Sequence, residues 1–373
     1  MRAKYTKNSK RWIIKIGSAL LTKDGKGLDY NAIEDWTAQI ALLRQQGREV
    51  ILVSSGSVAE GMSRMGWDKR PTELAELQAA AAIGQTGLIE AYEAQFKKHQ
   101  IQAAQILLTH DDVSNRKRYL NARNTLNALL KFKALPIINE NDTVALEEMR
   151  LGDNDTLAAL VANLVEADLL VILTDQEGLF DKDPRHNSDA KLISEESACN
   201  PDLQKFVGSI STALGSGGMG TKLTAAQRAA FSGCATIIAS GREEKVLQRL
   251  SKGEEIGTLL IPDNTKISAR KQWIAGQVQA SGVLFLDNGA SQAILKQGTS
   301  LLPIGVDKSE GEFKRGDIVD CKNADGSIVA RGLINYSSSE VRLLHKTPSN
   351  KISEVLNYTG DAELIHRDNL VLI

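Results

Sequence analysis

The sequence has few cysteines and no long apolar run. Its 3 cysteines, Cys199, Cys234 and Cys321, lie far apart and have no histidine at metal-ligand spacing. An odd and scattered set of cysteines argues against a disulfide framework or a zinc site, so we expect reduced thiols in a cytoplasmic protein. The apolar runs all fall short of the roughly 20 residues that a membrane helix needs, and we expect no association with a membrane.

Net charge is also nearly absent, because 45 Lys and Arg residues balance 46 Asp and Glu residues to leave −1. A surface that tracks phosphates is basic, so we predict no general affinity for nucleic acid or for an anionic membrane. The 5 histidines show neither triad nor metal spacing, and we predict no metal site built by protein side chains. Hydrophobic residues at 42% and charged residues at 24% are ordinary for a globular protein, and 373 residues suit two domains.

Short apolar runs alternate with helical patterns over about the first 260 residues. Strands that are apolar on both faces and separated by helices are typical of a mainly parallel sheet with helices on both sides. We therefore predict an α/β fold, a three-layer αβα sandwich, whose ligands lie beyond the carboxyl ends of the strands. The expected strands are residues 11–17, 49–56, 104–109, 135–139, 169–175 and 235–240, and the expected helices are residues 31–46, 121–133, 155–166 and 222–232, with a further helical region between residue 57 and about residue 98.

The pattern changes after about residue 277. Short β-rich stretches alternate there with glycine and aspartate turns such as Asp325-Gly326, which is typical of a small β-barrel. We predict two domains, residues 1–276 and 277–373, with a helix over residues 264–276 that links them.

A lysine interrupts the first predicted strand, where Lys15 is followed by Gly17 and Ser18. A lysine among apolar strand residues is costly unless its ammonium group reaches water or an anion. It could lie at a sheet edge and extend to solvent, or it could contact a phosphate that Gly17 allows the backbone to approach. The stretch from Ser54 to Ser57, at the end of the second strand, presents a similar choice between a helix cap and an anion site.

Amide and acidic side chains gather at two further places. Asn139 to Asp142 follow an apolar strand directly, and Gly152 to Thr156 open a predicted helix. A solvated loop would explain the first stretch, and helix capping would explain the second. The first stretch also suits a substrate that carries an ammonium group, which needs acceptors around it. Two acids and an amide around one helix start exceed what capping requires.

A glycine-rich stretch, Gly215 to Lys222, runs into a predicted helix. It almost matches two nucleotide-binding patterns. However, no strong strand precedes it, as a dinucleotide site requires, and its threonine and lysine stand in the reverse order for a P-loop. Both patterns share flexible glycines, a lysine and a helix N-terminus that faces a polyphosphate. We predict that role here, with a plain glycine loop as the alternative.

These stretches, in this order, resemble the amino acid kinase family from end to end, through the motifs VSSG, INEND, GDND, LTDQEGLF and SGGMGTKL. The tail resembles the PUA domain that some members of the family carry. The resemblance implies the amino acid kinase fold and the ATP-dependent phosphorylation, with Mg²⁺, of the side-chain carboxylate of L-glutamate. That reaction is the first step of proline biosynthesis, and proline is the implied inhibitor.

The resemblance also implies roles for individual residues. Lys15 and Lys222 would flank the transferred phosphoryl group, and Asp155 would position both lysines. The residues implied for glutamate binding are Ser55, Asn139, Asp142 and Asn154. Those implied for nucleotide binding are Lys15, Thr174, Asp175, Ser216, Gly217, Gly218, Met219, Gly220, Thr221 and Lys222.

The implied partners are ATP, L-glutamate, proline, further copies of the chain in a dimer or tetramer, and a glutamate-5-semialdehyde dehydrogenase that receives the product. Two alternatives stay open. The combination of INEND, GDND and the PUA-like tail counts against another family member, such as an acetylglutamate or aspartate kinase. An RNA-binding PUA protein would need a basic tail, whereas residues 281–373 hold 10 Lys and Arg and 12 Asp and Glu residues, a charge of about −2.

Overall fold

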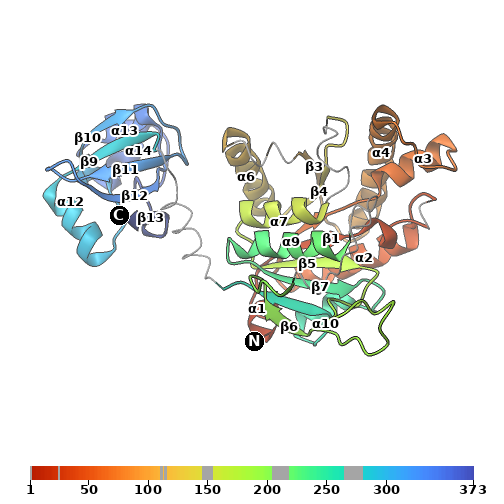
Figure 1. The fold of residues 1–373 in the computed structure, drawn as a ribbon. Helices are drawn as coiled ribbons and strands as arrows, with labels where there is room; N and C mark the ends of the chain where they lie inside the picture. Colours follow the sequence, from red (N-terminus) through yellow and green to blue (C-terminus); the bar gives the residue numbers. More distant parts are fainter. Residues whose placement is uncertain are drawn as a thin grey trace. The chain divides into compact units, whose positions relative to one another are not determined.

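The fold is described from a computed structural model of the chain. The described residues are 2–23, 26–109, 112, 116–144, 154–203, 218–263 and 280–373. The chain divides into two compact units, residues 1–264 and 265–373 (Figure 1). The predicted boundary after residue 276 and the predicted helix over residues 264–276 lie outside the described residues.

One mainly parallel sheet organises the first unit. The strand order is β3-β4-β2-β1-β5-β7-β8-β6; neighbours from β3 to β7 run parallel, whereas β8 is antiparallel to β7 and parallel to β6. The sequence predicts all of these strands except β6 and β8, which are short and lie at one edge. The bounds are β1 (Arg11–Ile16), β2 (Glu49–Val53), β3 (Ala103–Leu108), β4 (Leu135–Glu140), β5 (Leu169–Thr174), β6 (Glu195–Ser197), β7 (Ala235–Ser240) and β8 (Thr258–Ile261).

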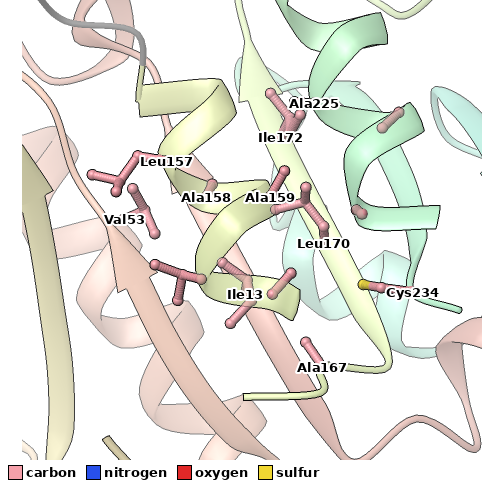
Figure 2. Close-up of a cluster of buried hydrophobic side chains, with 14 of the residues drawn as sticks. Ile13, Val53, Leu157, Ala158, Ala159, Ala167, Leu170, Ile172, Ala225 and Cys234 are labelled. Carbon is pink, nitrogen blue, oxygen red and sulfur yellow. The ribbon is translucent and has the colours of Figure 1, made fainter. Parts of the chain in front are cut away.

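Helices cover both faces of this sheet. One face packs against α2, α4 and α10 through a core that includes Tyr92 and Leu247. The other packs against α6, α7 and α9 through a core that includes Leu157 and Ala225 (Figure 2). The three-layer αβα sandwich predicted from the sequence is therefore confirmed. The helix bounds are α1 (Arg2–Thr6), α2 (Tyr30–Gln45), α3 (Ser57–Met65), α4 (Leu74–Lys98), α6 (Arg116–Lys131), α7 (Asn154–Leu164), α9 (Met219–Ala230) and α10 (Val246–Ser251).

Strand β1 lies between β2 and β5, near the middle of the sheet. Successive side chains of a strand point to opposite faces. Trp12 and Ile14 therefore belong to the core beneath α2, while Ile13 faces α7 and α9. Lys15 shares the face of Ile13 and reaches α7. The alternation of side chains along β1 thus places Lys15 on the face of the sheet that α7 covers.

Helices α3 and α4 touch through their backbones. A Cβ at Gly61 would lie 1.7 Å from the carbonyl oxygen of Ala80, and a Cβ at Gly84 would lie 1.8 Å from that of Ser57. Only glycine permits such an approach. The predicted helical region between residues 57 and 98 is therefore a pair of helices, held at a short fixed distance.

The second unit contains a 5-stranded sheet of order β10-β9-β11-β12-β13, in which β9 and β11 are parallel and the other neighbours antiparallel. Its core includes Leu284, Cys321 and Tyr336. The strands are β9 (Gly282–Leu286), β10 (Val306–Gly311), β11 (Ile318–Lys322), β12 (Ile328–Leu333) and β13 (Leu370–Leu372), and the helices are α12 (Asn288–Gln292), α13 (Ser338–Leu344) and α14 (Ile352–Leu356).

Two expectations from composition concern both units. Cys199, Cys234 and Cys321 all lie among the described residues and are free thiols. In the described parts of the chain, no helix combines the length and the apolar character needed to cross a membrane.

Candidate active site

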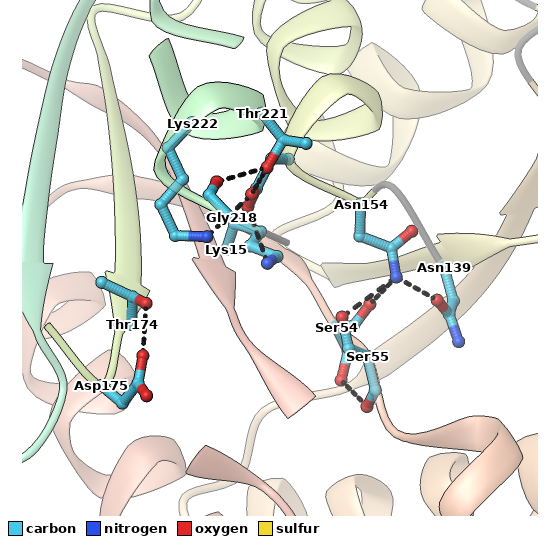
Figure 3. A network of polar contacts seen from close by, with 11 residues as sticks. Lys15, Ser54, Ser55, Asn139, Asn154, Thr174, Asp175, Gly218, Thr221 and Lys222 are labelled. Atoms are coloured by element: carbon cyan, nitrogen blue, oxygen red, sulfur yellow. Dashed lines mark hydrogen bonds and ion pairs between the residues drawn. The ribbon is translucent and has the colours of Figure 1, made fainter. Parts of the chain in front are cut away.

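Two lysines and one aspartate meet where α7 begins. Lys15 extends from β1, Asp155 is the second residue of α7, and Lys222 lies in the first turn of α9. The Nζ atom of Lys15 is 2.7 Å from Oδ1 of Asp155, and that of Lys222 is 3.0 Å from Oδ2 (Figure 3). The three residues are only 5%, 1% and 4% exposed in chain order. The structure therefore brings the predicted catalytic residues together, and the alternative of an edge-strand Lys15 extending to solvent is wrong.

The charges of this triad depend on one another. Burial by itself would raise the pKa of Asp155, but the ammonium groups of Lys15 and Lys222 outweigh it, so the pKa of this carboxyl lies below its usual value. Asp155 is therefore ionised at neutral pH. One buried carboxylate thus contacts two buried ammonium groups. Such a pair of ammonium groups suits an anion, and a polyphosphate above all.

Thr221 ties the glycine stretch to the triad. Its hydroxyl group lies 2.9 Å from Oδ2 of Asp155 and 2.8 Å from the carbonyl oxygen of Gly218. Gly218 is exposed and precedes the first residue of α9, Met219, in an extended conformation. A helix N-terminus presents backbone N–H groups that bind phosphate oxygens. Of the predicted nucleotide residues, Ser216 and Gly217 lie outside the described part of the chain.

Asn154, one residue before Asp155, turns to the opposite side of α7 and joins a group of amides and hydroxyls (Figure 3). Its Nδ2 atom lies 2.8 Å from the carbonyl oxygen of Ser54, 3.1 Å from Oγ of Ser55 and 3.0 Å from Oδ1 of Asn139. These contacts join the ends of β2 and β4 to the start of α7. The structure thus brings together three of the residues predicted to bind glutamate.

The orientation of the Asn154 amide is fixed by a backbone group. A carbonyl oxygen only accepts hydrogen bonds, so the atom that faces Ser54 must be the nitrogen. Oδ1 then points away from these partners. It is buried, and within the described residues no donor reaches it. Because a buried acceptor without a donor is costly, this atom is suited to receive an N–H group from a ligand.

Asp142, the fourth predicted glutamate residue, is also buried. It accepts a hydrogen bond of 3.2 Å from the hydroxyl of Ser57, the first residue of α3. Burial and the nearby charge of Glu140 raise the pKa of Asp142 to about 6, so the group is mostly ionised at neutral pH. Its negative charge would gain most from a cationic ligand beside it.

Thr174 is the last residue of β5, and Asp175 follows it directly. The hydroxyl of Thr174 donates to Oδ1 of Asp175 at 3.0 Å, and the side chain of Asp175 is exposed. In Figure 3 the pair lies on the Lys222 side, away from Asn139 and Asn154. This is the side on which the start of α9 would meet a nucleotide.

Two contacts around the amides were missed by the sequence analysis. Both come from α4, where Tyr92 accepts a hydrogen bond of 3.1 Å from the hydroxyl of Ser54, and Gln85 accepts one of 2.7 Å from Asn139. Neither residue lies at a strand end or a helix start. No sequence signal that we used could have found them.

The side chains around the triad bear on how a magnesium ion could be held. Among the described residues, no group of three or more His, Cys, Asp and Glu side chains is placed to hold a metal ion. Both carboxylate oxygens of Asp155 already face ammonium groups. Mg²⁺ is commonly bound through substrate phosphates with few protein ligands. The described side chains therefore fit a magnesium ion held mainly by the phosphates of a nucleotide.

The comparison with protein families agrees with this geometry. The sequence model of the amino acid kinase family matches residues 10–240. The chain belongs to the amino acid kinase family. The matched range contains the triad, the amide group and the start of α9. A model of the PUA domain matches residues 282–356, within the second unit.

Similar members of the amino acid kinase family cover nearly the whole chain. A glutamate 5-kinase of Thioalkalivibrio sulfidiphilus is 60% identical over 98% of this chain and 97% of the relative. One of Methylococcus capsulatus is 59% identical over 98% and 97%. One of Pseudomonas fluorescens is 57% identical over 100% of both chains. The resemblance drawn from the motifs, including its PUA-like tail, is confirmed.

Proposed function

We propose that this chain transfers the γ-phosphoryl group of ATP, bound as its magnesium complex, to the side-chain carboxylate of L-glutamate, the first step of proline biosynthesis. Glutamate 5-kinases that are 57% to 60% identical support this. The observation that carries the proposal is the start of α7. There Asn154 faces an amide group while Asp155 holds two buried lysines, so an amino acid and a polyphosphate would meet at neighbouring residues.

The lysines answer the main difficulty of the reaction, which is that two anions must meet. The side-chain carboxylate of glutamate has a pKa of about 4.3, is ionised at neutral pH and needs no general base. One of its oxygens bonds to the γ-phosphorus as the bond to the bridging oxygen of ADP breaks, which yields an acyl phosphate and ADP. Lys15 and Lys222 would neutralise the phosphoryl oxygens during this exchange, and Asp155 would hold both lysines in place.

The amide group would select the amino acid. Oδ1 of Asn154 would accept an N–H of the substrate's ammonium group, and ionised Asp142 would supply the opposite charge. Ser55 and Asn139 complete the wall of this subsite. N-acetylglutamate has no ammonium group, and aspartate is one methylene shorter, so neither satisfies both halves of the site. These differences favour glutamate over the substrates of other family members.

Regulation and partners are extensions of this proposal. Proline carries a cationic nitrogen beside a carboxylate, so we propose that it inhibits by competing with glutamate for Asn154 and Asp142. From the resemblance of the motifs alone, we also propose a homo-oligomer, a dimer or tetramer, that delivers its product to a glutamate-5-semialdehyde dehydrogenase in the cytoplasm. A surface that binds RNA is basic, whereas the PUA domain is nearly neutral, so we do not propose RNA binding.

Trapping the product tests the proposal. The purified protein would be incubated with ATP, Mg²⁺ and hydroxylamine, which converts an acyl phosphate into a hydroxamate. We expect hydroxamate from L-glutamate and little from N-acetylglutamate or aspartate. Product from either of the latter, but none from glutamate, would make the substrate assignment wrong. Proline inhibition that saturating glutamate does not relieve would contradict competition at one site.

A further inference from the structure

Gln85, on helix α4, contacts the amide group through Asn139. The Oε1 atom of Gln85 lies 2.7 Å from Nδ2 of Asn139, although 54 positions separate the two residues in the chain. Gln85 is half-buried and Asn139 is buried. The neighbouring Gly84 holds this part of α4 against α3, because a Cβ there would lie 1.8 Å from the carbonyl oxygen of Ser57. The backbone that carries Gln85 is therefore fixed in position.

A backbone group decides which end of the Asn139 amide faces Gln85. The N–H of Glu140 donates to Oδ1 of Asn139 at 2.9 Å. Because a backbone N–H can only donate, the atom beside it must be oxygen. Nδ2 of Asn139 is then the end that needs an acceptor, and Oε1 of Gln85 provides one.

The orientation of Asn139 supports that of Asn154, which the carbonyl group of Ser54 also fixes. Oδ1 of Asn139 accepts from Nδ2 of Asn154 at 3.0 Å. If the Asn139 amide turned over, two NH₂ groups would face each other, and this contact would be lost. A chain of oriented hydrogen bonds therefore runs from Gln85 through Asn139 to Asn154, and it ends at the buried, open Oδ1 of Asn154.

We propose that Gln85 is a positioning residue for recognition of the substrate's ammonium group. It accepts from Asn139 and so holds Asn154 with Oδ1 directed at the ligand. The inference rests on the proposed function, in which Asn154 binds the amino acid. Because Gln85 acts through Asn139 and not on the reacting atoms, its effect should fall on amino acid binding and not on phosphoryl transfer.

Substitutions at this position separate hydrogen bonding from packing. Gln85→Glu keeps an acceptor, Gln85→Met keeps the length without an acceptor, and Gln85→Lys places a donor there. A buried amide that loses its partner weakens binding by about tenfold, so we expect that rise in the glutamate KM for Gln85→Met. We expect a larger rise for Gln85→Lys and a change below about threefold for Gln85→Glu. Both kcat and the KM for ATP should stay within about twofold.

Glutarate, which is glutamate without its amino group, tests whether the effect concerns the ammonium. Its inhibition constant against glutamate should be the same in the wild type and in Gln85→Met. Gln95→Met is the matched control, because Gln95 is a half-buried glutamine of the same helix. It should change none of these constants. Melting temperatures would establish that every variant is folded.

The outcomes separate the possible explanations. Equal weakening of glutamate and glutarate, equal impairment of Gln85→Glu and Gln85→Met, or a loss confined to kcat would each overturn the inference and leave Gln85 a packing role. A wild-type protein that makes no hydroxamate from glutamate would instead overturn the proposed function, and this inference with it.

Discussion

The two halves of the active site are held by different forces. In the lysine half, Lys15, Asp155 and Lys222 are held by ion pairs of 2.7 Å and 3.0 Å. In the amide half, Asn139 and Asn154 are held by neutral hydrogen bonds whose direction the backbone fixes. Charges are suited to a phosphoryl group whose own charge moves during transfer. Oriented amides are suited to distinguishing one bound substrate from another.

The halves are separated by a single peptide bond, since Asn154 and Asp155 are the first two residues of α7. Asn154 contacts Ser54 and Asn139, whereas Asp155 contacts Lys15 and Lys222. Turnover and amino acid affinity should therefore be separable by substituting one residue or its neighbour.

The largest effect is expected from Asp155→Asn, which should break the lysine half and spare the amide half. Two buried ammonium groups would then face a neutral amide. We expect kcat to fall by about 10²- to 10³-fold, the scale for a lost transition-state contact. The free energy of unfolding should fall by about 3–5 kcal/mol, as when a buried ion pair is broken. Kinetics and chemical denaturation would measure both. A defect in glutamate KM alone would show that the halves are not separate.

Lys222→Ala should lower kcat by about 10²-fold, because it removes one of the two cations on the phosphoryl group and leaves Asp155 paired with Lys15. The glutamate KM should hardly change. Arg228→Ala is the matched control, since Arg228 is an exposed cation on the same helix. Steady-state kinetics with ATP and glutamate varied in turn would measure the effect. A glutamate KM that rises in step with the loss of kcat would contradict the division.

Asn154→Ala should raise the glutamate KM more than it lowers kcat. It removes the proposed acceptor for the ammonium group, and a hydrogen bond to a charged group corresponds to a rise in glutamate KM of about 10- to 100-fold. The fall in kcat should be smaller, because this contact is made before and during the reaction. Asn163→Ala, at the other end of α7, is the control, as its amide contacts the carbonyl of Arg228. Equal glutamate KM values for Asn154→Ala and Asn163→Ala would show that Asn154 does not bind the substrate.

A smaller effect is expected from pH. The pKa of Asp142 is raised to about 6, and its ionised form is the one that attracts an ammonium group. The glutamate KM should therefore rise as the pH falls through 6, reaching about tenfold at pH 5, where about a tenth of the group is ionised. A pH profile of kcat/KM would measure this. Asp142→Asn should flatten the profile, and an unchanged slope in that variant would exclude Asp142 as the titrating group.

The smallest effect concerns stability without ligand. Because the folded pKa of Asp142 lies above its unfolded value of about 3.9, its protonation stabilises the fold below about pH 4. That contribution is lost as the pH rises through about 6. Asp142→Asn should therefore raise the melting temperature relative to wild type at pH 8 but not at pH 4. If Asp142→Asn melts at a lower temperature than the wild type at pH 8, ionised Asp142 does not destabilise the fold.

Features encoded by neighbouring residues could be predicted from the sequence. The buried strands β1, β4 and β5 are mainly apolar, and a lysine inside the first of them had to meet an anion or water. The polar residues at the carboxyl ends of such strands lie at one edge of a parallel sheet, which located Asn139 and Thr174. β6 was missed because Glu195–Ser197 is short and polar, and it is a strand only through its pairing with β8.

Contacts between distant segments could not be predicted. The hydrophobic pattern of α4 locates a helix but does not say which polar side chain will meet the end of β4. Gln85 reaches Asn139 across 54 positions and Tyr92 reaches Ser54 across 38. Both depend on the close packing of α3 and α4, which follows from two glycines whose role appears only in the assembled fold.

The distances along the chain also set an order of events during synthesis. Asn154 contacts Ser54, which precedes it by 100 positions, whereas Asp155 contacts Lys222, which follows it by 67. The ribosome delivers the N-terminal segments first. All residues of the amide half have therefore been made once α7 has been made, while the second lysine has not. We expect the lysine half to be the last part of the site to form.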